Sequence, residues 1–224
     1  MIKVYIDGDP IVYQSVYGCN TNNQVSRKVD KSILSIMDGT QATEGTLAIK
    51  GKGNFRKTIF TAYKGHRKKL MTPEQQEMFN FAYEYLQSEW GAIPADGQEA
   101  DDLLATWHTS EEGIICSIDK DLLQVPGLHY NPKSRELTLI DEDKAAYLLH
   151  KQFLTGDATD NIKGIPGIGD KKATKILEGV STKHLLKTVR ETWKEIYGTG
   201  WQQELQLTAD LVYLKRHEKD RFIT

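Results

Sequence analysis

Three short apolar runs, each ended by a polar turn, most constrain the fold of this 224-residue chain. They lie at residues 3–6, 46–49 and 113–118, and each is continuous rather than alternating. Continuous runs of this length are typical of strands that are buried on both faces of a parallel sheet. Two further runs, at residues 128–130 and 137–140, flank the segment NPKSRE and predict a hairpin or a short connection.

Helical patterns lie between and after these runs. Residues 72–75 (TPEQ) form a strong helix start, with a threonine cap, a proline in the first turn and a glutamine that closes a capping box. Apolar residues then recur at helical spacing to about residue 90. Residues 98–108 and 143–154 predict two more helices, and the chain is helical from residue 170 onward with short breaks.

The order of these elements predicts the fold class and a division of the chain. Strands and helices alternate up to about residue 140, and only helices follow. This order predicts an α/β core with a parallel-rich central sheet, carrying a helical C-terminal part. We place the boundary between the core, 1–142, and the helical part, 143–224.

Charge is strongly polarised along the chain, although the formal net charge is only −2. Residues 50–69 contain eight Lys or Arg residues and no acid. Acids gather instead near the start of the chain and in the motifs EADD, DKD and GDATD. A polarised chain of this kind suits a polyanionic partner and a reaction that needs cations.

Several features favour a cytoplasmic protein. The apolar runs are too short to cross a membrane, and the N-terminus does not resemble a secretory signal. Cys19 and Cys116 make no disulfide framework, and the apolar surroundings of Cys116 predict a buried free thiol. A reducing compartment fits this cysteine usage.

Three acidic groups follow predicted strands or open a predicted helix. Ligands of an open parallel sheet bind beyond the carboxyl ends of its strands, so we expect Asp7 and Asp119 to point into one cleft. Glu99 and Asp102 share a face of their helix, whereas Asp101 is turned from Asp102 by about 100°. The groups consist of Asp7, Asp9, Glu99, Asp101, Asp102, Asp119 and Asp121.

Carboxylates gathered in one cleft repel each other unless a cation holds them. Oxygen ligands without a neighbouring histidine favour Mg²⁺ or Mn²⁺ over zinc. Two such ions about 3.5–4 Å apart can activate water and stabilise the leaving oxygen in phosphodiester cleavage. Any one of these acids taken alone is more often a helix cap or a surface residue, but the three groups together favour a metal cleft.

The segment GIPGIGDKKATKIL has the form of a hairpin between two helices. Its glycines let the backbone approach a ligand closely, and amides beside the next helix start can bind a phosphate. Lys171, Lys172 and Lys175 would add contacts to a nucleic-acid backbone. The alternative is a plain Gly-Pro turn. Asp170, at the exit of the hairpin, fits a helix cap.

Aromatic residues interleave with the basic residues of the run at 50–69. Phe55, Phe60 and Tyr63 could stack on the bases of a single strand while Lys and Arg meet its phosphates. A solvated basic surface explains this run equally well.

Taken together, the motifs DGD, GNFRK with YKGHR, EADD, SIDKDLLQ and GDATDNIKGIPGIG occur in an order that resembles the 5′-nuclease family of phages and bacteria. That family includes flap endonucleases, phage 5′–3′ exonucleases and the 5′-nuclease domain of bacterial DNA polymerase I. The resemblance extends over residues 3–180, and the start DGD is most similar to the phage exonuclease branch.

The resemblance implies a PIN-like, resolvase-type α/β core with an arch segment at 52–95, and a helix–hairpin–helix motif at 155–180. It implies a 5′–3′ exonuclease or flap endonuclease that hydrolyses DNA with two Mg²⁺ or Mn²⁺ ions, and a K⁺ ion on the hairpin carbonyls. The expected partners are DNA with a 5′ end, flap or nick, and replication proteins. We expect a monomer in the cytoplasm, that of the host if a phage encodes it.

Motif matching to this family also assigns residues. It gives the first metal site Asp7, Glu99, Asp101 and Asp102, and the second Asp119, Asp121, Asp157 and Asp160. Lys64 and Arg67 match the basic residues that reach the scissile phosphate, so the expected catalytic set is Lys64, Arg67, Asp7, Asp102 and Asp121. The expected DNA contacts are Arg56, Lys64, Arg67, Gly164, Gly167, Gly169, Lys171 and Lys172.

The chain departs from the family pattern in two places. Relatives usually carry an aspartate at the end of the second strand, where this chain has Lys50 or Gly51. The first ion is then held by the remaining acids, with help from Asp9, or activity is weaker. Only about 25 residues separate YKGHR from the turn before EADD, so we expect a short arch of one main helix, Pro73–Trp90.

Two other functions remain open. A PIN-type ribonuclease shares the fold class, but such proteins are usually shorter and lack the glycine hairpin. A DNA-binding protein that has lost catalysis is supported only by the missing acid near Gly51.

Overall fold

The computed structural model describes residues 1–66 and 71–224, and the chain forms two compact units. The expected boundary at residue 142 assigned the basic segment Arg56–Arg67 to the core, whereas the structure groups this segment with the helical part. Unit 1 comprises Met1–Phe55, Lys68–Leu122 and Gly127–Leu139, and unit 2 comprises Arg56–Arg67, Leu123–Pro126 and Ile140–Thr224.

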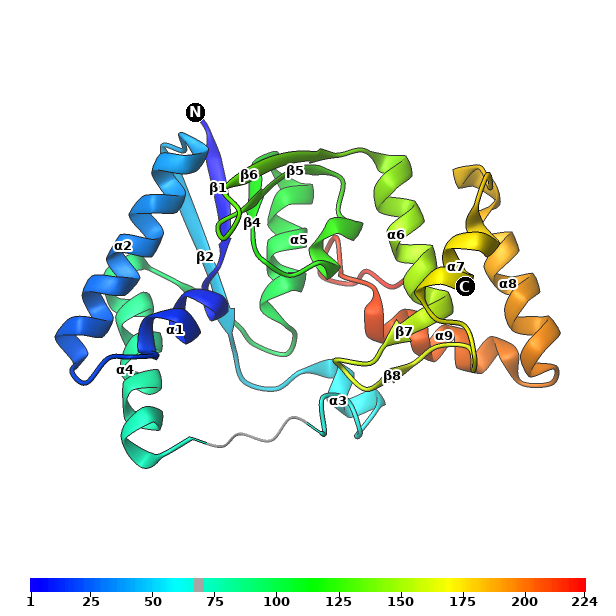
Figure 1. The fold of residues 1–224 in the computed structure, drawn as a ribbon, viewed down its shortest axis with the longest axis horizontal. Helices are drawn as coiled ribbons and strands as arrows, with labels where there is room; N and C mark the ends of the chain where they lie inside the picture. Colours follow the sequence, from blue (N-terminus) through cyan, green and yellow to red (C-terminus); the bar gives the residue numbers. More distant parts are fainter. Residues whose placement is uncertain (67–70) are drawn as a thin grey trace. The chain divides into compact units, whose positions relative to one another are not determined.

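Unit 1 is built on a six-stranded sheet with the strand order β3-β2-β1-β4-β5-β6 (Figure 1). The four pairings β1–β2, β1–β4, β2–β3 and β4–β5 are all parallel, which confirms the expected parallel-rich α/β core. The strands are β1 (Lys3–Asp7), β2 (Glu44–Lys50), β3 (Ile93–Ala95), β4 (Ile114–Cys116), β5 (Gly127–Asn131) and β6 (Glu136–Ile140).

Helices cover both faces of this sheet (Figure 1). Because side chains alternate along a strand, Val4 and Ile6 of β1 enter the core on one face and Tyr5 points to the other. The Tyr5 ring lies 6.1 Å from the ring of Trp107, on the helix of that second face. The helices are α1 (Gly8–Val16), α2 (Asn22–Thr40) and α4 (Pro73–Trp90) on the first face, and α5 (Ala100–Ser110) on the second.

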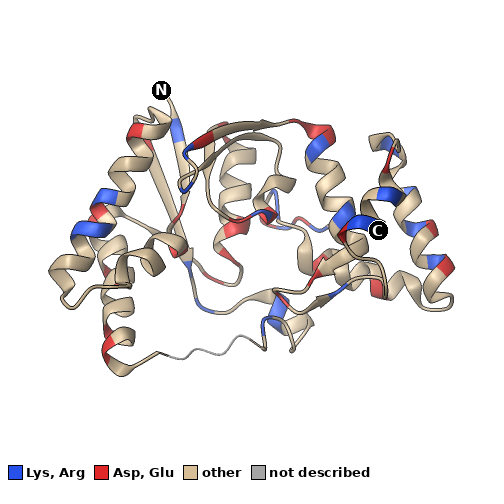
Figure 2. Cartoon of the chain, viewed as in Figure 1, with Lys and Arg blue, Asp and Glu red and all other residues tan. Residues whose placement is uncertain are grey.

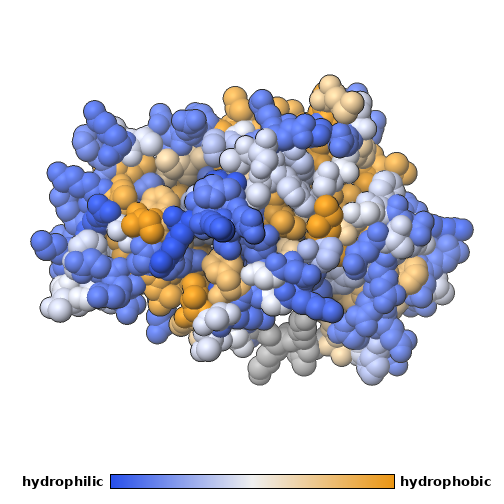
Figure 3. All heavy atoms as spheres, turned by 180° about the vertical axis from the view of Figure 1, so that it is seen from behind, coloured by the Kyte–Doolittle hydropathy of each residue, from blue (hydrophilic) through white to orange (hydrophobic). Residues whose placement is uncertain are grey.

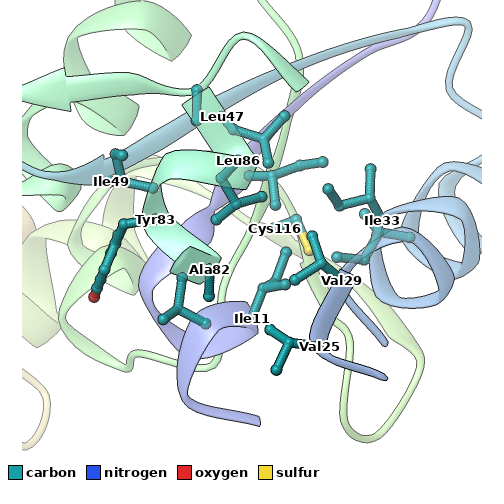
Figure 4. Close-up of a cluster of buried hydrophobic side chains, with 14 of the residues drawn as sticks. Ile11, Val25, Val29, Ile33, Leu47, Ile49, Ala82, Tyr83, Leu86 and Cys116 are labelled. Atoms are coloured by element: carbon teal, nitrogen blue, oxygen red, sulfur yellow. The ribbon is translucent and has the colours of Figure 1, made fainter. Parts of the chain in front are cut away.

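The main core of unit 1 lies between the sheet and the first three helices. Val25, Val29 and Ile33 follow one another at four-residue spacing along α2 and are at most 1% exposed. Figure 4 shows them near Ile11 of α1 and Cys116 of β4. Burial of each such aliphatic side chain contributes about 1.5–3 kcal/mol. The spacing of these residues explains α2, a helix that the sequence analysis did not include.

Helix α4 begins and ends as expected. The Thr72 hydroxyl accepts a hydrogen bond from the Gln75 amide (3.3 Å), and the Gln75 side chain accepts one from the Thr72 amide (3.1 Å). Gly91 ends the helix in a left-handed conformation, with φ of 63°. Phe79 and Leu86 are buried in the core of unit 1, so α4 is part of this core rather than a free-standing arch.

Unit 2 is mainly helical in the part of the chain that the structure describes. Phe153, Trp193 and Leu205 are fully buried at its centre, and the Trp193 indole donates a hydrogen bond to the Phe153 carbonyl (2.9 Å). A short antiparallel pair, β7 with β8, lies between its first two long helices. The elements are α6 (Glu142–Thr155), β7 (Gly156–Asp157), β8 (Ile162–Lys163), α7 (Asp170–Leu177), α8 (Thr182–Tyr197) and α9 (Trp201–Val212).

Two short helices lie where the chain passes between the units, α3 (Phe55–Ile59) and the 3₁₀ helix η1 (Asp121–Gln124). Among the described residues, no helix is both long enough and apolar enough to span a lipid bilayer. The face drawn in Figure 3 is mostly hydrophilic, with hydrophobic residues in scattered spots.

Candidate functional site

The carboxyl ends of β1 and β4 bring the first acids of unit 1 together. Asp7 is the last residue of β1, and its Oδ2 accepts a hydrogen bond from the Ser117 hydroxyl (2.8 Å), just beyond β4. Ser117 in turn accepts one from the Asp119 amide (3.0 Å), and Asp119 Oδ1 accepts one from the Asp121 amide (2.9 Å). Because β1 and β4 are parallel neighbours, their ends meet at one edge of the sheet.

Asp7 is the most perturbed acid of this group. Burial, followed by the negative charges of Asp9 and Asp119, raises the pKa of Asp7 to about 7. The hydrogen bond from Ser117 opposes this shift. A buried carboxyl repelled by its neighbours is a position at which a bound cation would be stabilising.

A second acid, Asp9, approaches the end of β2. Its Oδ1 accepts a hydrogen bond from the Lys50 amide (3.0 Å). Burial raises the pKa of Asp9, and the contact with Lys50 opposes that shift. The Lys50 ammonium lies 4.0 Å from the centre of the Tyr83 ring, whose pKa is raised by burial and by the charge of Asp9.

Gly51, directly after β2, has no room for a side chain. A Cβ at this position would overlap the backbone of Ala95 and Asp96. The last side chain of β2 is that of Lys50, and the Lys50 amide contacts Asp9 of α1.

The start of α5 holds the next acids through reciprocal capping. Asp102 is fully buried, and its Oδ2 accepts a hydrogen bond from the Glu99 amide (3.1 Å). The Glu99 side chain accepts one from the Asp102 amide in return. Asp101 lies in the same first turn and is partly buried. A carboxylate has two oxygens, so capping through one leaves a metal role open to the other.

Unit 2 carries Asp157 and Asp160 on the turn between β7 and β8. Their carboxylate oxygens approach within 4.8 Å of one another. Asp160 is 7% exposed, and its Oδ2 accepts a hydrogen bond from the Tyr63 hydroxyl (2.9 Å) and pairs with the Lys64 ammonium (3.3 Å). The Lys64 amide also donates to the Asp160 carbonyl (2.9 Å). Tyr63 and Lys64 of the motif YKGHR are therefore held against the acidic turn GDATD.

The glycine hairpin that follows depends on close backbone contact. A Cβ at Gly156 would overlap the Gly164 backbone, and a Cβ at Gly164 would overlap the Thr155 and Gly156 backbone. Gly167 has a φ of 76°, which glycine adopts without strain. Gly169 is the N-cap of α7 and makes no side-chain cap.

Comparisons with known proteins identify the family to which this chain belongs. A family model described as 5′-3′ exonuclease, N-terminal resolvase-like domain, matches residues 3–153. The chain belongs to this 5′–3′ exonuclease family. Curated relatives include DNA polymerase I of Geobacillus stearothermophilus, which is 30% identical over 95% of this chain. The 5′-3′ exonuclease of Buchnera aphidicola is 24% identical over 99% of this chain and 83% of that protein.

The chain spans only about a quarter of the polymerase, 27% of its length. Among solved structures, the T5 D15 protein co-crystallised with metal ions has a TM-score of 0.68 and 19% identity over 95% of this chain and 86% of that one. A T5 D15 flap endonuclease complex with DNA and metal ions has a TM-score of 0.63 and 16% identity, over 95% of this chain and 99% of that one. These likenesses show that the 5′–3′ exonuclease fold extends over nearly the whole chain.

Two expected functional residues of this family member have structural roles instead. Arg56 is 1% exposed, and its guanidinium donates to the carbonyls of Leu211 (2.8 Å) and Tyr213 (2.9 Å). This burial contradicts the expectation that Arg56 contacts DNA. Tyr63 is 2% exposed and supports Asp160, so the expectation that it stacks on bases is wrong.

Three other expectations concern the segments beside the hairpin. Arg67 lies outside the described residues. Lys171 and Lys172 lie exposed in the first turn of α7. Figure 2 shows the basic residues along the chain. Asp170 follows the N-cap Gly169 and pairs with Lys151 (2.6 Å), so the expectation that Asp170 is the cap is wrong.

The sequence analysis did not identify Ser117 and Tyr83 as site residues. Ser117 contacts Asp7, and Tyr83 lies close enough to Asp9 for the charge of Asp9 to raise its pKa. Ser117 could have been noticed because it directly precedes Asp119 at the end of a predicted strand. Tyr83 lies 74 positions after Asp9 in the chain (83 minus 9), and only the packing of α4 against α1 brings it close.

Proposed function

We propose that this chain is a metal-dependent 5′–3′ nuclease that hydrolyses phosphodiester bonds in DNA at a 5′ end, flap or nick. The observation that carries the proposal is the buried carboxyl of Asp7, surrounded by further acids at the carboxyl edge of a parallel sheet. This arrangement occurs in a chain that belongs to the 5′–3′ exonuclease family. Relatives are named as exonucleases and flap endonucleases.

The acids of unit 1 have the chemistry of a magnesium or manganese site. The donors are carboxylate oxygens, which hard divalent cations prefer. We assign Asp7, Glu99, Asp101 and Asp102 to the first ion, with Asp9 in support. The raised pKa of Asp7 supports this assignment, because burial and the charge of Asp9 make its ionised form unfavourable unless a cation binds. Such ions would supply a water made nucleophilic by coordination and would stabilise the leaving oxygen.

From the order of the family's motifs in the chain, we assign the second ion to Asp119, Asp121, Asp157 and Asp160. The placement of Asp157 and Asp160 on one turn supports a shared role for that pair.

Lys64 is the described basic residue that we assign to the scissile phosphate. Its ammonium is held beside Asp160, and its backbone adopts a left-handed conformation with φ of 53°. A side chain held in this way loses less conformational freedom when a substrate binds. The ammonium would stabilise the negative charge that develops on the phosphate during cleavage. Arg67 is proposed for the same role from its place in the motif alone.

The hairpin from Gly164 to Gly169, with the start of α7, would hold the DNA backbone beside the cut. The first amides of a helix are favourable sites for a phosphate, and Gly169 at the N-cap leaves them without a competing side-chain cap. Lys171 and Lys172 would add sequence-independent contacts. A K⁺ ion on the hairpin carbonyls is part of the same proposal.

The experiment that tests this function uses 5′-labelled and 3′-labelled flap, nicked and blunt duplexes. We expect cleavage with Mg²⁺ or Mn²⁺, none with a chelator, and product lengths that report 5′–3′ polarity. If the chain binds the flap duplex but releases no product with either ion, the proposal is wrong and a DNA-binding function replaces it. Cleavage of RNA in preference to DNA would favour a PIN-type ribonuclease.

A further inference from the structure

A pocket in unit 1 opens beside Asp7 and has no role in the function proposed above. α1 and α2 form its walls, and the ends of β1, β4 and β5 form its floor. Its volume is about 180 Å³, which is room for about six water molecules at ~30 Å³ each. A ligand of this size is a single heteroaromatic ring system rather than a long chain or a folded peptide.

Seven of the thirteen residues that line this pocket are apolar, and several of these are buried. Ile11, Ile36 and Tyr130 are buried side chains from three different elements. Tyr130 is held against α2, because only a glycine at position 39 leaves room for its hydroxyl. Ile118 is 41% exposed, and a ligand in the pocket would cover it. Apolar walls of this kind favour a flat, uncharged ligand.

Polar groups stand at two places on the pocket: on α1 and α2, where Lys31 and Ser32 also line it, and at the ends of β1 and β4. Gln14 and Ser35 lie exposed on α1 and α2, where an amide and a hydroxyl can pair with the edge of a planar ring. Asp7 and Ser117 lie at the inner end, joined by their hydrogen bond. The carboxyl of Asp7 disfavours a phosphate inside the pocket, so the phosphate of a nucleotide would remain outside, toward the acids and their cations.

We propose that this pocket receives one nucleobase of the DNA strand that is cut. The proposal rests on the nuclease function, since a phosphate brought to Asp7 carries a base only one sugar away. A base that enters the pocket has to leave its stack, which costs a few kcal/mol in a duplex and least at a single-stranded end. The pocket therefore favours substrates whose strand is single-stranded or frayed at the cleavage position.

The test compares an intact flap substrate with two abasic versions, which lack the base on one or the other side of the scissile phosphate. Loss of the base that occupies the pocket should slow single-turnover cleavage roughly 5–100-fold, the effect of losing one stacked base. The other abasic substrate should be cut at nearly the rate of the intact one. Equal rates on all three substrates would overturn the proposal.

A pocket-filling variant makes the test specific. Ser35→Phe should place a ring in the pocket, so intact and abasic substrates should be cut at one reduced rate. Leu34→Phe is the matched control, because Leu34 is the neighbouring exposed residue of α2 and does not line the pocket. Leu34→Phe should cut the sensitive abasic substrate more slowly than the intact one, by the same factor as the wild-type chain. If Ser35→Phe shows the same rate difference between intact and abasic substrates as the wild-type chain, the base is bound elsewhere.

A binding measurement separates this proposal from the proposed function. In EDTA, without cleavage, the wild-type chain should bind the sensitive abasic flap more weakly than the intact flap, and Ser35→Phe should bind both equally. Ile118→Ala should also reduce the difference in affinity between the intact and the abasic flap. Because Ile118 is exposed, this second variant keeps the test decisive if Ser35→Phe does not fold. If no DNA is cut with Mg²⁺ or Mn²⁺, the nuclease function fails, yet these affinities still decide whether the pocket holds a base.

Discussion

Asp7 is the residue on which the account of the acidic site depends. Its carboxyl is buried, and repulsion from Asp9 and Asp119 adds to the cost of ionising it. The folded chain therefore binds this proton more tightly than the unfolded chain, whose aspartate has a pKa near 3.9. Between about pH 4 and pH 7, the folded state holds more protons, so its free energy of unfolding falls as the pH rises.

The first prediction concerns this pH dependence in the metal-free chain. Between pH 4 and pH 8, the free energy of unfolding of the wild-type chain should fall by ~1–4 kcal/mol more than that of Asp7→Asn. The asparagine of the variant has no proton to release over this range. Urea unfolding in EDTA at a series of pH values measures it. Added Mg²⁺ should restore wild-type stability at pH 8 and leave the variant nearly unchanged. Identical pH profiles for both proteins would show that Asp7 is not the perturbed group.

The end of β2 gives the second prediction. Gly51→Ala would force a Cβ into the Ala95 backbone, so it should lower the free energy of unfolding by about 1–3 kcal/mol or more. Lys50→Ala loses an exposed side chain and its contact with the Tyr83 ring, so it should cost less than about 1 kcal/mol. Thermal unfolding of both variants tests this difference. A stable Gly51→Ala would mean that an aspartate could also stand there.

The position of a site residue was predictable from the sequence where it depends only on which strand the residue follows. Asp7 and Asp119 follow two apolar runs, and neighbouring parallel strands bring such residues to one edge. The role of Arg56 was not predictable, because its burial depends on carbonyls of Leu211 and Tyr213, about 155 residues further along the chain. A basic run gives no sign of which of its members will be buried.

At the scale of elements, the predicted strands and most helices agree with the structure. The continuous apolar runs became the parallel strands β1, β2 and β4, because both faces of the sheet are covered. Helix α2 was absent from the expectations, although Val25, Val29 and Ile33 show a four-residue period. Three polar residues separate each of these positions from the next, so the apolar stripe is narrow in this part of the helix.

The hairpin gives the third prediction. Gly164→Ala would place a Cβ on the Thr155 backbone, so it should separate β7 from β8 and weaken the binding of flap DNA at least ~10-fold. Gly169→Ala is the control, because its φ of −98° suits alanine and open space surrounds it. It should change stability by less than about 1 kcal/mol. Binding measured in EDTA tests both, and an unaffected Gly164→Ala would exclude the hairpin from DNA binding.

In the whole molecule, we assign one function to acids that lie far apart in the sequence. Asp119 and Asp121 belong to unit 1, and Asp157 and Asp160 belong to unit 2. Their association was inferred from motif order, since no local pattern relates residue 121 to residue 160. The central claim is that these acids act together on DNA through bound metal ions.

The measurement that tests this claim most directly is single-turnover cleavage of saturating flap DNA with Mg²⁺. Loss of a contact in the outer shell of a metal site lowers activity roughly 10–100-fold. Asp121→Asn and Asp160→Asn should each lower the cleavage rate by more than this. Both variants should bind flap DNA in EDTA as tightly as the wild-type chain. Asp170→Asn, at an exposed acid at the start of α7, should cut at nearly the wild-type rate. Wild-type cleavage by Asp160→Asn or Asp121→Asn would contradict the account.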